Sequence, residues 1–176
     1  CWVIERCLAK EPGERYASTR DLARDLAALR DRRLYDGALI VVAGDNLFSE
    51  KLGAFGDFCR AKNAPVLGVY DVGSLEAAKK YGVVAVNRDG VISDFQEKPA
   101  LPASTLIGIA LYYYPRATLP LVAQYLAEGN NPDQPGRLVQ WLYSRTPVYV
   151  WNVPGIWYDI GSKETLEEAN RIFARK

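Results

Sequence analysis

Two acidic segments of the chain, residues 44–46 and 157–162, carry side chains that could bind a divalent cation. Asp45 directly follows an apolar run at 38–43, and ligand sites of open α/β sheets lie beyond the carboxyl ends of the strands. A carboxylate there could hold Mg²⁺, which prefers oxygen ligands and usually keeps several waters beside one or two protein carboxylates. Taken singly, Asp45 could equally be a turn or helix-cap residue, and Asp159 part of a capped turn before a helix.

A third polar segment, Glu97-Lys98-Pro99, lies between the two acidic ones in the sequence. The chain contains no histidine, so any chemistry would have to use carboxylates, lysine or a metal ion. Standing alone, Glu97 and Lys98 would be read as a solvated pair in a loop, and Trp157 as a core aromatic residue.

The composition predicts a globular protein, because 176 residues with 49% hydrophobic content suffice for one domain with a sizeable core. Basic residues number 22 and acidic ones 21, and no block of like charge favours nucleic acid as a partner. No apolar run approaches the roughly 20 residues that span a membrane. Three cysteines, Cys1, Cys7 and Cys59, fit no metal-binding spacing and are expected to be free thiols. We therefore expect a soluble, cytoplasmic protein.

From residue 38 onward, short apolar runs alternate with amphipathic segments, which predicts an α/β fold with flanking helices. The expected strands are 38–43, 65–71, a hairpin over 83–95, 106–114, 147–153 and a short strand around Trp157. The expected helices are 50–62, 74–81, 117–128, 136–144 and 163–175. Before residue 37 the pattern is helical, with Leu22, Leu26 and Leu29 on one face of 18–33.

Four motifs in order, at 39–48, 81–84, 95–99 and 157–162, resemble those of the sugar-phosphate nucleotidyltransferases that include glucose-1-phosphate thymidylyltransferase. The resemblance covers residues 37–176. It implies a Rossmann-like, GT-A-like mixed sheet, here preceded by a short α-helical segment. It also implies the reaction of that family, in which a sugar 1-phosphate oxygen attacks the α-phosphorus of a nucleoside triphosphate and pyrophosphate leaves. Since two anions must meet, a divalent ion and a lysine are needed, but no strong base.

The same resemblance implies a role for each residue of the motifs. Asp45 and Asp159 would be the Mg²⁺ ligands and, with Lys98, the catalytic residues. The implied substrate-binding residues are Asn46 beside the sugar phosphate, Gly82 where the backbone approaches the sugar, Glu97 accepting hydroxyl hydrogen bonds, Lys98 neutralising phosphate, and Trp157 lining the sugar pocket.

The chain departs from that family before residue 37. The family's glycine-rich G-G-x-G-T-R-L-x-P loop, which binds the triphosphate, has no counterpart here. Residues 1–31 instead resemble the last subdomain of bacterial serine/threonine protein kinases, most clearly at 4–16. Kinase activity is excluded, because the glycine-rich loop and the HRD, DFG and APE motifs are missing. We therefore predict a kinase-like helical remnant and junction at 1–36, fused to a truncated nucleotidyltransferase domain at 37–176.

These observations predict transfer of a nucleotidyl group, by the resemblance from dTTP, to a hexose 1-phosphate, impaired by the missing loop. The alternatives are a non-catalytic module that binds a sugar nucleotide or regulates a partner, and a fusion fragment without function. Loss of a neighbouring strand would leave the strand at 38–43 with a flat apolar edge. We therefore expect the chain to form homo-oligomers through this edge.

Overall fold

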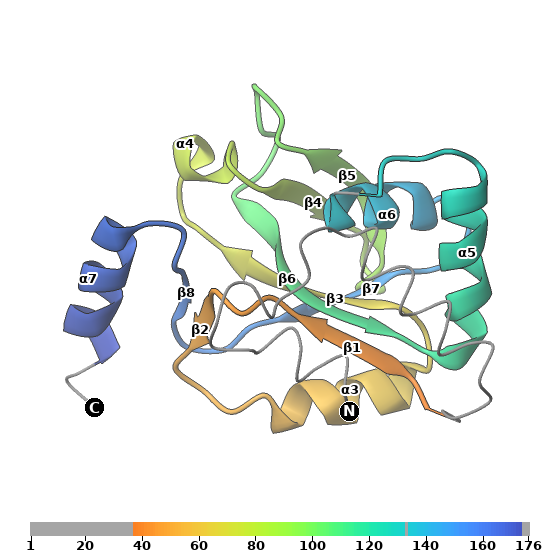
Figure 1. The fold of residues 1–176 in the computed structure, drawn as a ribbon, viewed down its shortest axis with the longest axis horizontal. Helices are drawn as coiled ribbons and strands as arrows, with labels where there is room; N and C mark the ends of the chain where they lie inside the picture. The colour runs from red at the N-terminus through yellow and green to blue at the C-terminus, as the bar shows by residue number, and fades with distance from the viewer. Residues whose placement is uncertain (1–36, 133, 174–176) are drawn as a thin grey trace.

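The computed structural model describes residues 37–132 and 134–173, and Figure 1 shows an α/β fold in this part of the chain. The kinase-like remnant predicted at 1–36 and the helix predicted at 18–33 lie outside the described residues. Within the described residues, no helix is long and apolar enough to cross a membrane.

A mixed sheet of six strands forms the centre of the described region (Figure 1). Its strands are β1 (Leu39–Val42), β3 (Val66–Asp71), β4 (Gly82–Val86), β5 (Ile92–Glu97), β6 (Leu106–Tyr114) and β7 (Tyr149–Asn152). The order is β5-β4-β6-β3-β7, and β1 pairs with β6. Strands β3 and β7 are parallel, whereas β6 is antiparallel to β1, β3 and β4. The predicted α/β fold with a mixed sheet is thus confirmed.

Strand β6 is apolar along its whole length because both of its faces are buried. Side chains alternate between the faces of a strand. Accordingly, Ile107, Ile109 and Leu111 pack in one core cluster, whereas Tyr112 and Tyr114 pack in the other.

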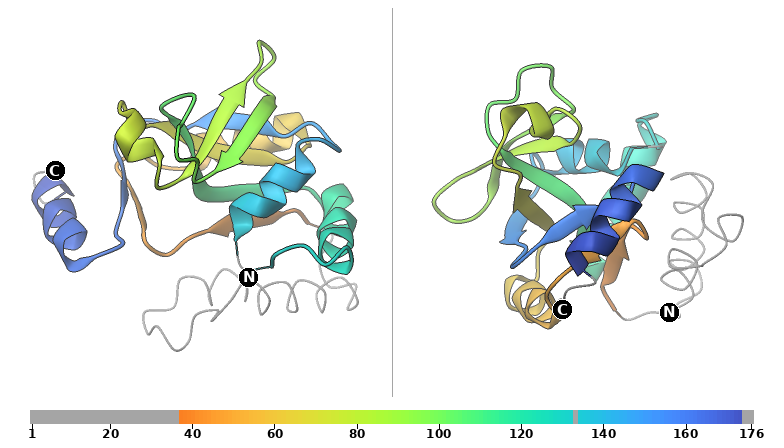
Figure 2. Two further views of the ribbon diagram at one scale, coloured as in Figure 1. Left: turned by 90° about the horizontal axis from the view of Figure 1, so that it is seen from above. Right: turned by 90° about the vertical axis from the view of Figure 1, so that its left-hand side faces the viewer.

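Helices cover both faces of the sheet (Figure 2). Helix α3 (Gly53–Lys62) buries Phe55 and Cys59 in one cluster, and α6 (Pro135–Leu142) buries Val139 and Leu142 in the other. The remaining helices are α4 (Leu75–Ala78), the 3-10 turn η2 (Arg116–Thr118), α5 (Leu119–Ala127) and α7 (Lys163–Phe173). All of them fall within the segments predicted to be helical, except that η2 and α6 each begin one residue earlier.

The structure departs from the predictions at β1. A continuous apolar run predicted a strand buried on both faces, but only Leu39 is fully buried and the other three residues are half-buried. The cause is its position, since β1 pairs with β6 on one side and has no strand on its outer side among residues 37–132 and 134–173. Such an open edge is what the predicted self-association requires, and the self-association itself stays a prediction.

A second difference is a small sheet that the sequence patterns did not reveal. Strand β2 (Asn46–Phe48) pairs antiparallel with β8 (Trp157–Asp159), and the register places Asn46 opposite Asp159. Three residues are too few to show a period of two, so only the strand around Trp157 was predicted. This small sheet lies between the main sheet and α7 (Figure 1).

Candidate active site

A cavity of about 290 Å³ lies where the small sheet meets the ends of β4, β5 and α6. All the predicted site residues line it, namely Asp45, Asn46, Gly82, Glu97, Lys98, Trp157 and Asp159. Residues far apart in the sequence are therefore brought together as a ligand site requires, while their individual roles stay predictions.

The pairing of β2 with β8 positions the two carboxylates. The Ile160 amide donates a hydrogen bond of 2.8 Å to the Asp45 carbonyl oxygen. This bond extends the pairing of β2 with β8 by one residue on each strand and holds Asp45 beside Asp159. The Trp157 indole Nε1 donates to Asn46 Oδ1, and Asn46 Nδ2 donates to Asp45 Oδ1 at 3.2 Å. Trp157 thus fixes the Asn46 amide, which in turn orients the Asp45 carboxylate.

The electrostatics of this pair favour a cation. Asp159 is half-buried and Asp45 is exposed. Burial, followed by repulsion from Asp45, raises the pKa of Asp159, and a hydrogen bond from Tyr81 opposes this shift. No group of three or more potential metal ligands occurs among the described residues. Two carboxylates nevertheless suit Mg²⁺, which completes its shell with water or phosphate oxygens.

Tyr81 belongs to the site although the sequence analysis assigned it no role. Its hydroxyl donates a 3.3 Å hydrogen bond to Asp159 Oδ2, and its ring packs edge-on against Trp157 with centroids 5.7 Å apart. Burial and the Asp159 charge raise the pKa of Tyr81 to about 12, so the phenol remains a donor at neutral pH. Tyr81 lies within the motif at 81–84, but only knowledge of its partner across the fold could reveal the contact.

Three glycines, Gly82, Gly108 and Gly136, are among the residues that line the cavity. Register places Gly82 between Glu97 and Gly108 on neighbouring strands. A Cβ at position 82 would overlap the Phe95 ring, so Gly82 is required for packing, whatever its role toward a sugar. Phe95 and Glu97 lie two residues apart on β5 and therefore share one face of the strand.

Lys98 adopts a left-handed backbone conformation, with φ of 47°. This conformation is uncommon for residues other than glycine, asparagine and aspartate, and it costs about 1–2 kcal/mol. The Lys98 amide is held by a 3.1 Å hydrogen bond to the Tyr81 carbonyl, while the side chain is exposed. Strain of this kind concentrates at functional sites, where the surrounding structure maintains it.

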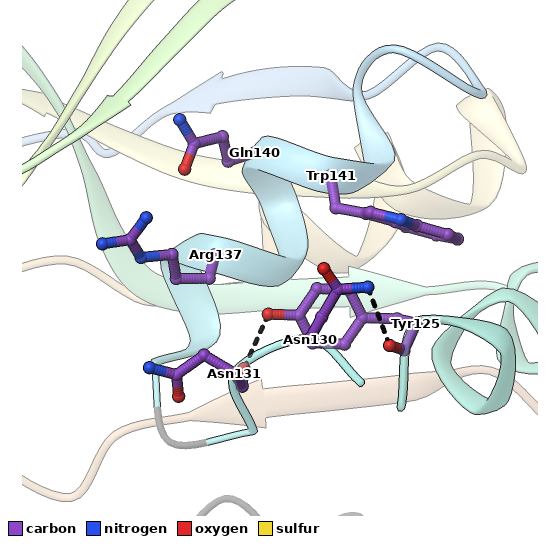
Figure 3. Close-up of a pocket in the computed structure, with 6 residues that line it drawn as sticks. All are labelled: Tyr125, Asn130, Asn131, Arg137, Gln140 and Trp141. Carbon is purple, nitrogen blue, oxygen red and sulfur yellow. Dashed lines mark hydrogen bonds between the residues drawn. The ribbon is translucent and has the colours of Figure 1, made fainter. Parts of the chain in front are cut away.

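A second cavity of about 430 Å³ lies between α5 and α6 and contains none of the predicted site residues (Figure 3). It is lined by Tyr125, Asn130, Asn131, Arg137, Gln140 and Trp141. The Tyr125 hydroxyl donates to the Asn131 carbonyl at 2.6 Å, and Asn130 Nδ2 donates to the Tyr125 carbonyl at 2.9 Å. The Trp141 indole donates to Glu128 at 2.8 Å. These contacts fasten the loop between the two helices, which is a structural role.

Fold and cavity together define a Rossmann-like α/β domain with a cavity at the end of its sheet that contains Asp45, Glu97 and Asp159. A family model described as Nucleotidyl transferase matches residues 5–176, and the chain therefore belongs to this family. The match confirms the resemblance inferred from the motifs. It begins within the segment predicted to be kinase-like, whose assignment stays a prediction.

Individual proteins agree with this membership. Glucose-1-phosphate adenylyltransferase of Bacillus subtilis is 30% identical over 139 residues, which cover 75% of this chain and 36% of the relative. A Bacillus anthracis protein assigned as glucose-1-phosphate thymidylyltransferase superposes with a TM-score of 0.69 at 19% identity, covering 88% of this chain and 59% of that one. The structure of UDP-glucose pyrophosphorylase in complex with UDP-glucose superposes with a TM-score of 0.70 at 20% identity. The match covers 89% of this chain and 62% of that one. The two structures confirm the fold, and the chain spans about a third of the length of the curated relatives it matches.

Proposed function

We propose that the cavity binds a hexose 1-phosphate with Mg²⁺, and that the chain is a sugar-1-phosphate nucleotidyltransferase. The observation that carries the proposal is the placement of Asp45 and Asp159 side by side in one cavity with Glu97 and Lys98. The named relatives share glucose 1-phosphate or a glucose nucleotide and differ in the base. Glucose 1-phosphate is therefore the sugar to test first, with dTTP as the proposed donor and ATP and UTP as its competitors.

The proposed role of each group follows from its charge and position. Asp45 and Asp159 would hold the cation, which supplies positive charge between the two reacting anions. Lys98 would neutralise phosphate, and Glu97 would accept hydrogen bonds from sugar hydroxyls. Tyr81 keeps the Asp159 carboxylate in place through its hydrogen bond. Trp157 closes one wall of the cavity and, through Asn46, orients the Asp45 carboxylate.

A second candidate function is binding without catalysis. It is favoured by one observation, that no group of three or more potential metal ligands occurs in the part of the chain that the structure describes. In this case the chain would bind a sugar phosphate or sugar nucleotide and act as a regulatory module. A fusion fragment without function, the remaining alternative, would bind neither ligand. The proposed location of the chain is the cytoplasm, which agrees with Cys59 being a free, buried thiol.

The experiment that separates these functions uses the full chain. Binding of glucose 1-phosphate, with and without Mg²⁺, is measured by calorimetry, and pyrophosphate release is measured with dTTP, ATP and UTP. Asp45→Asn should abolish Mg²⁺-dependent release, whereas Asp57→Asn, a control at an exposed acid paired with Arg60 on α3, should retain it. Binding without release would support the regulatory module. Failure to bind glucose 1-phosphate or any glucose nucleotide would refute both functions.

A further inference from the structure

Gly136, in the first turn of α6, lies against the carboxylate of Glu97. A Cβ at position 136 would overlap Glu97 Oε2, would lie 2.9 Å from Glu97 Cδ and would touch the Phe95 ring at 3.4 Å. Both Gly136 and Glu97 line the 290 Å³ cavity. The carboxylate therefore occupies space that is open only because residue 136 has no side chain.

The fold fixes both sides of this contact. Helix α6 begins at Pro135 and is anchored by Val139 and Leu142, which are almost completely buried in the core. On β5, Phe95 is buried and fills the space above Gly82, and this packing anchors the strand that carries Glu97. The first turn of a helix also carries a partial positive charge, which favours a carboxylate beside it.

We infer that Gly136 is a positioning residue, which keeps the Glu97 carboxylate directed into the cavity as an acceptor for a sugar hydroxyl. The hydroxyl part of this inference rests on the proposed function, whereas the placement of Glu97 does not. The carboxylate is the free end of a flexible side chain, so a methyl group at position 136 displaces it without unfolding the protein. The variant Gly136→Ala therefore removes the acceptor and leaves Asp45, Asp159 and Lys98 in place.

The test compares glucose 1-phosphate with inorganic phosphate as probes, both in the presence of Mg²⁺. Gly136→Ala should weaken glucose 1-phosphate binding on the order of tenfold, the size expected for losing one hydrogen bond to a charged acceptor. Binding of inorganic phosphate, which has no sugar hydroxyls, should not change. The matched control is Gly53→Ala, at the start of α3, where a Cβ meets nothing within 4 Å. It should bind both probes like the unmodified chain.

A double-mutant cycle tests whether Gly136 acts through Glu97. Glu97→Ala should weaken glucose 1-phosphate binding to a similar degree, and adding Gly136→Ala should weaken it little further. Fully additive losses, or an equal loss of phosphate binding in Gly136→Ala, would overturn the inference.

A ligand-free readout separates this inference from the proposed function. In a crystal structure, Gly136→Ala should show the Glu97 carboxylate displaced, and Gly53→Ala should not. If the unmodified chain binds no sugar 1-phosphate, the proposed function fails, and the placement of Glu97 is still decided by these data. An unmoved Glu97 in Gly136→Ala would refute the positioning role.

Discussion

Replacement of Asp159 by asparagine should stabilise the ligand-free protein at pH 7. The Asp159 carboxylate is half-buried and faces the like charge of Asp45, and these two factors raise its pKa. Asparagine keeps the shape and an acceptor for the Tyr81 hydroxyl but carries no charge. The variant therefore loses the repulsion and keeps most of the packing.

The magnitude follows from the exposure of the pair. Two unit charges at about 4 Å repel by about 1 kcal/mol in water and by more in a protein interior. Asp45 is exposed, so solvent screening limits the gain to between about 0.3 and 1 kcal/mol. In a domain of this size, such a gain raises the melting temperature by roughly 1–3 °C.

The pH dependence of this gain has a definite sign. An acid whose pKa is raised on folding destabilises the folded state above that pKa and has no such effect below the ordinary value of 3.8. The advantage of Asp159→Asn should therefore be full at pH 7 and shrink as the pH falls toward 4.

Unfolding in urea, an uncharged denaturant that does not screen the repulsion, measures the gain at pH 7.0 and 4.5 with the metal removed, and Asp57→Asn is the exposed control. Added Mg²⁺ should reverse the order, because only the unmodified chain has both carboxylates. A less stable Asp159→Asn at pH 7, or a gain that does not depend on pH, would refute the electrostatic argument.

Three further predictions concern other parts of the molecule. Lys98→Gly should stabilise the protein by up to about 1 kcal/mol in urea unfolding, because glycine adopts the φ of 47° without strain. The same variant should bind phosphate more weakly, and a lower stability would contradict the strain argument. Burial raises the pKa of Cys59 to about 12, so in a Cys1→Ser/Cys7→Ser background Ellman's reagent at pH 8 should react only after guanidinium is added. The outer edge of β1, which no other strand of the described residues covers, should make the chain associate at increasing concentration in light scattering, and a monomer at all concentrations would contradict this.

The sequence was sufficient for elements whose residues interact mainly with a continuous core. Strand β6 and helix α6 were predicted close to their observed ends, because an apolar run and a periodic face report burial directly. Strand β2 was not predicted, since it exists only through pairing with β8, more than a hundred residues away in the chain. The partial exposure of β1 was missed for a similar reason, because apolar composition does not reveal how many strands lie beside it.

The residues of the candidate site also divide into those that the sequence could predict and those that depend on contacts between distant segments. Asp45, Asp159 and Lys98 could be proposed because their residue types suit a cation and a phosphate, and the motifs give their order. Tyr81 and Gly136 act through residues on other elements. Tyr81 falls within a motif that does not reveal its partner, and nothing in the immediate sequence neighbours of Gly136 marks it. Their roles emerge only when the β2–β8 pairing and the start of α6 are known.

Two local features of the 290 Å³ cavity oppose stability, and they distinguish it from the larger cavity between α5 and α6. Asp45 and Asp159 place like charges side by side, and Lys98 holds a strained backbone. The larger cavity is lined by a single charged side chain, Arg137, whose Nε donates a 3.0 Å hydrogen bond to Gln134 Oε1, so its lining contains no pair of like charges. Unfavourable features persist where function requires them. A bound cation would relieve the charge repulsion, and a bound phosphate would interact with Lys98. The smaller cavity is therefore the better candidate for the active site.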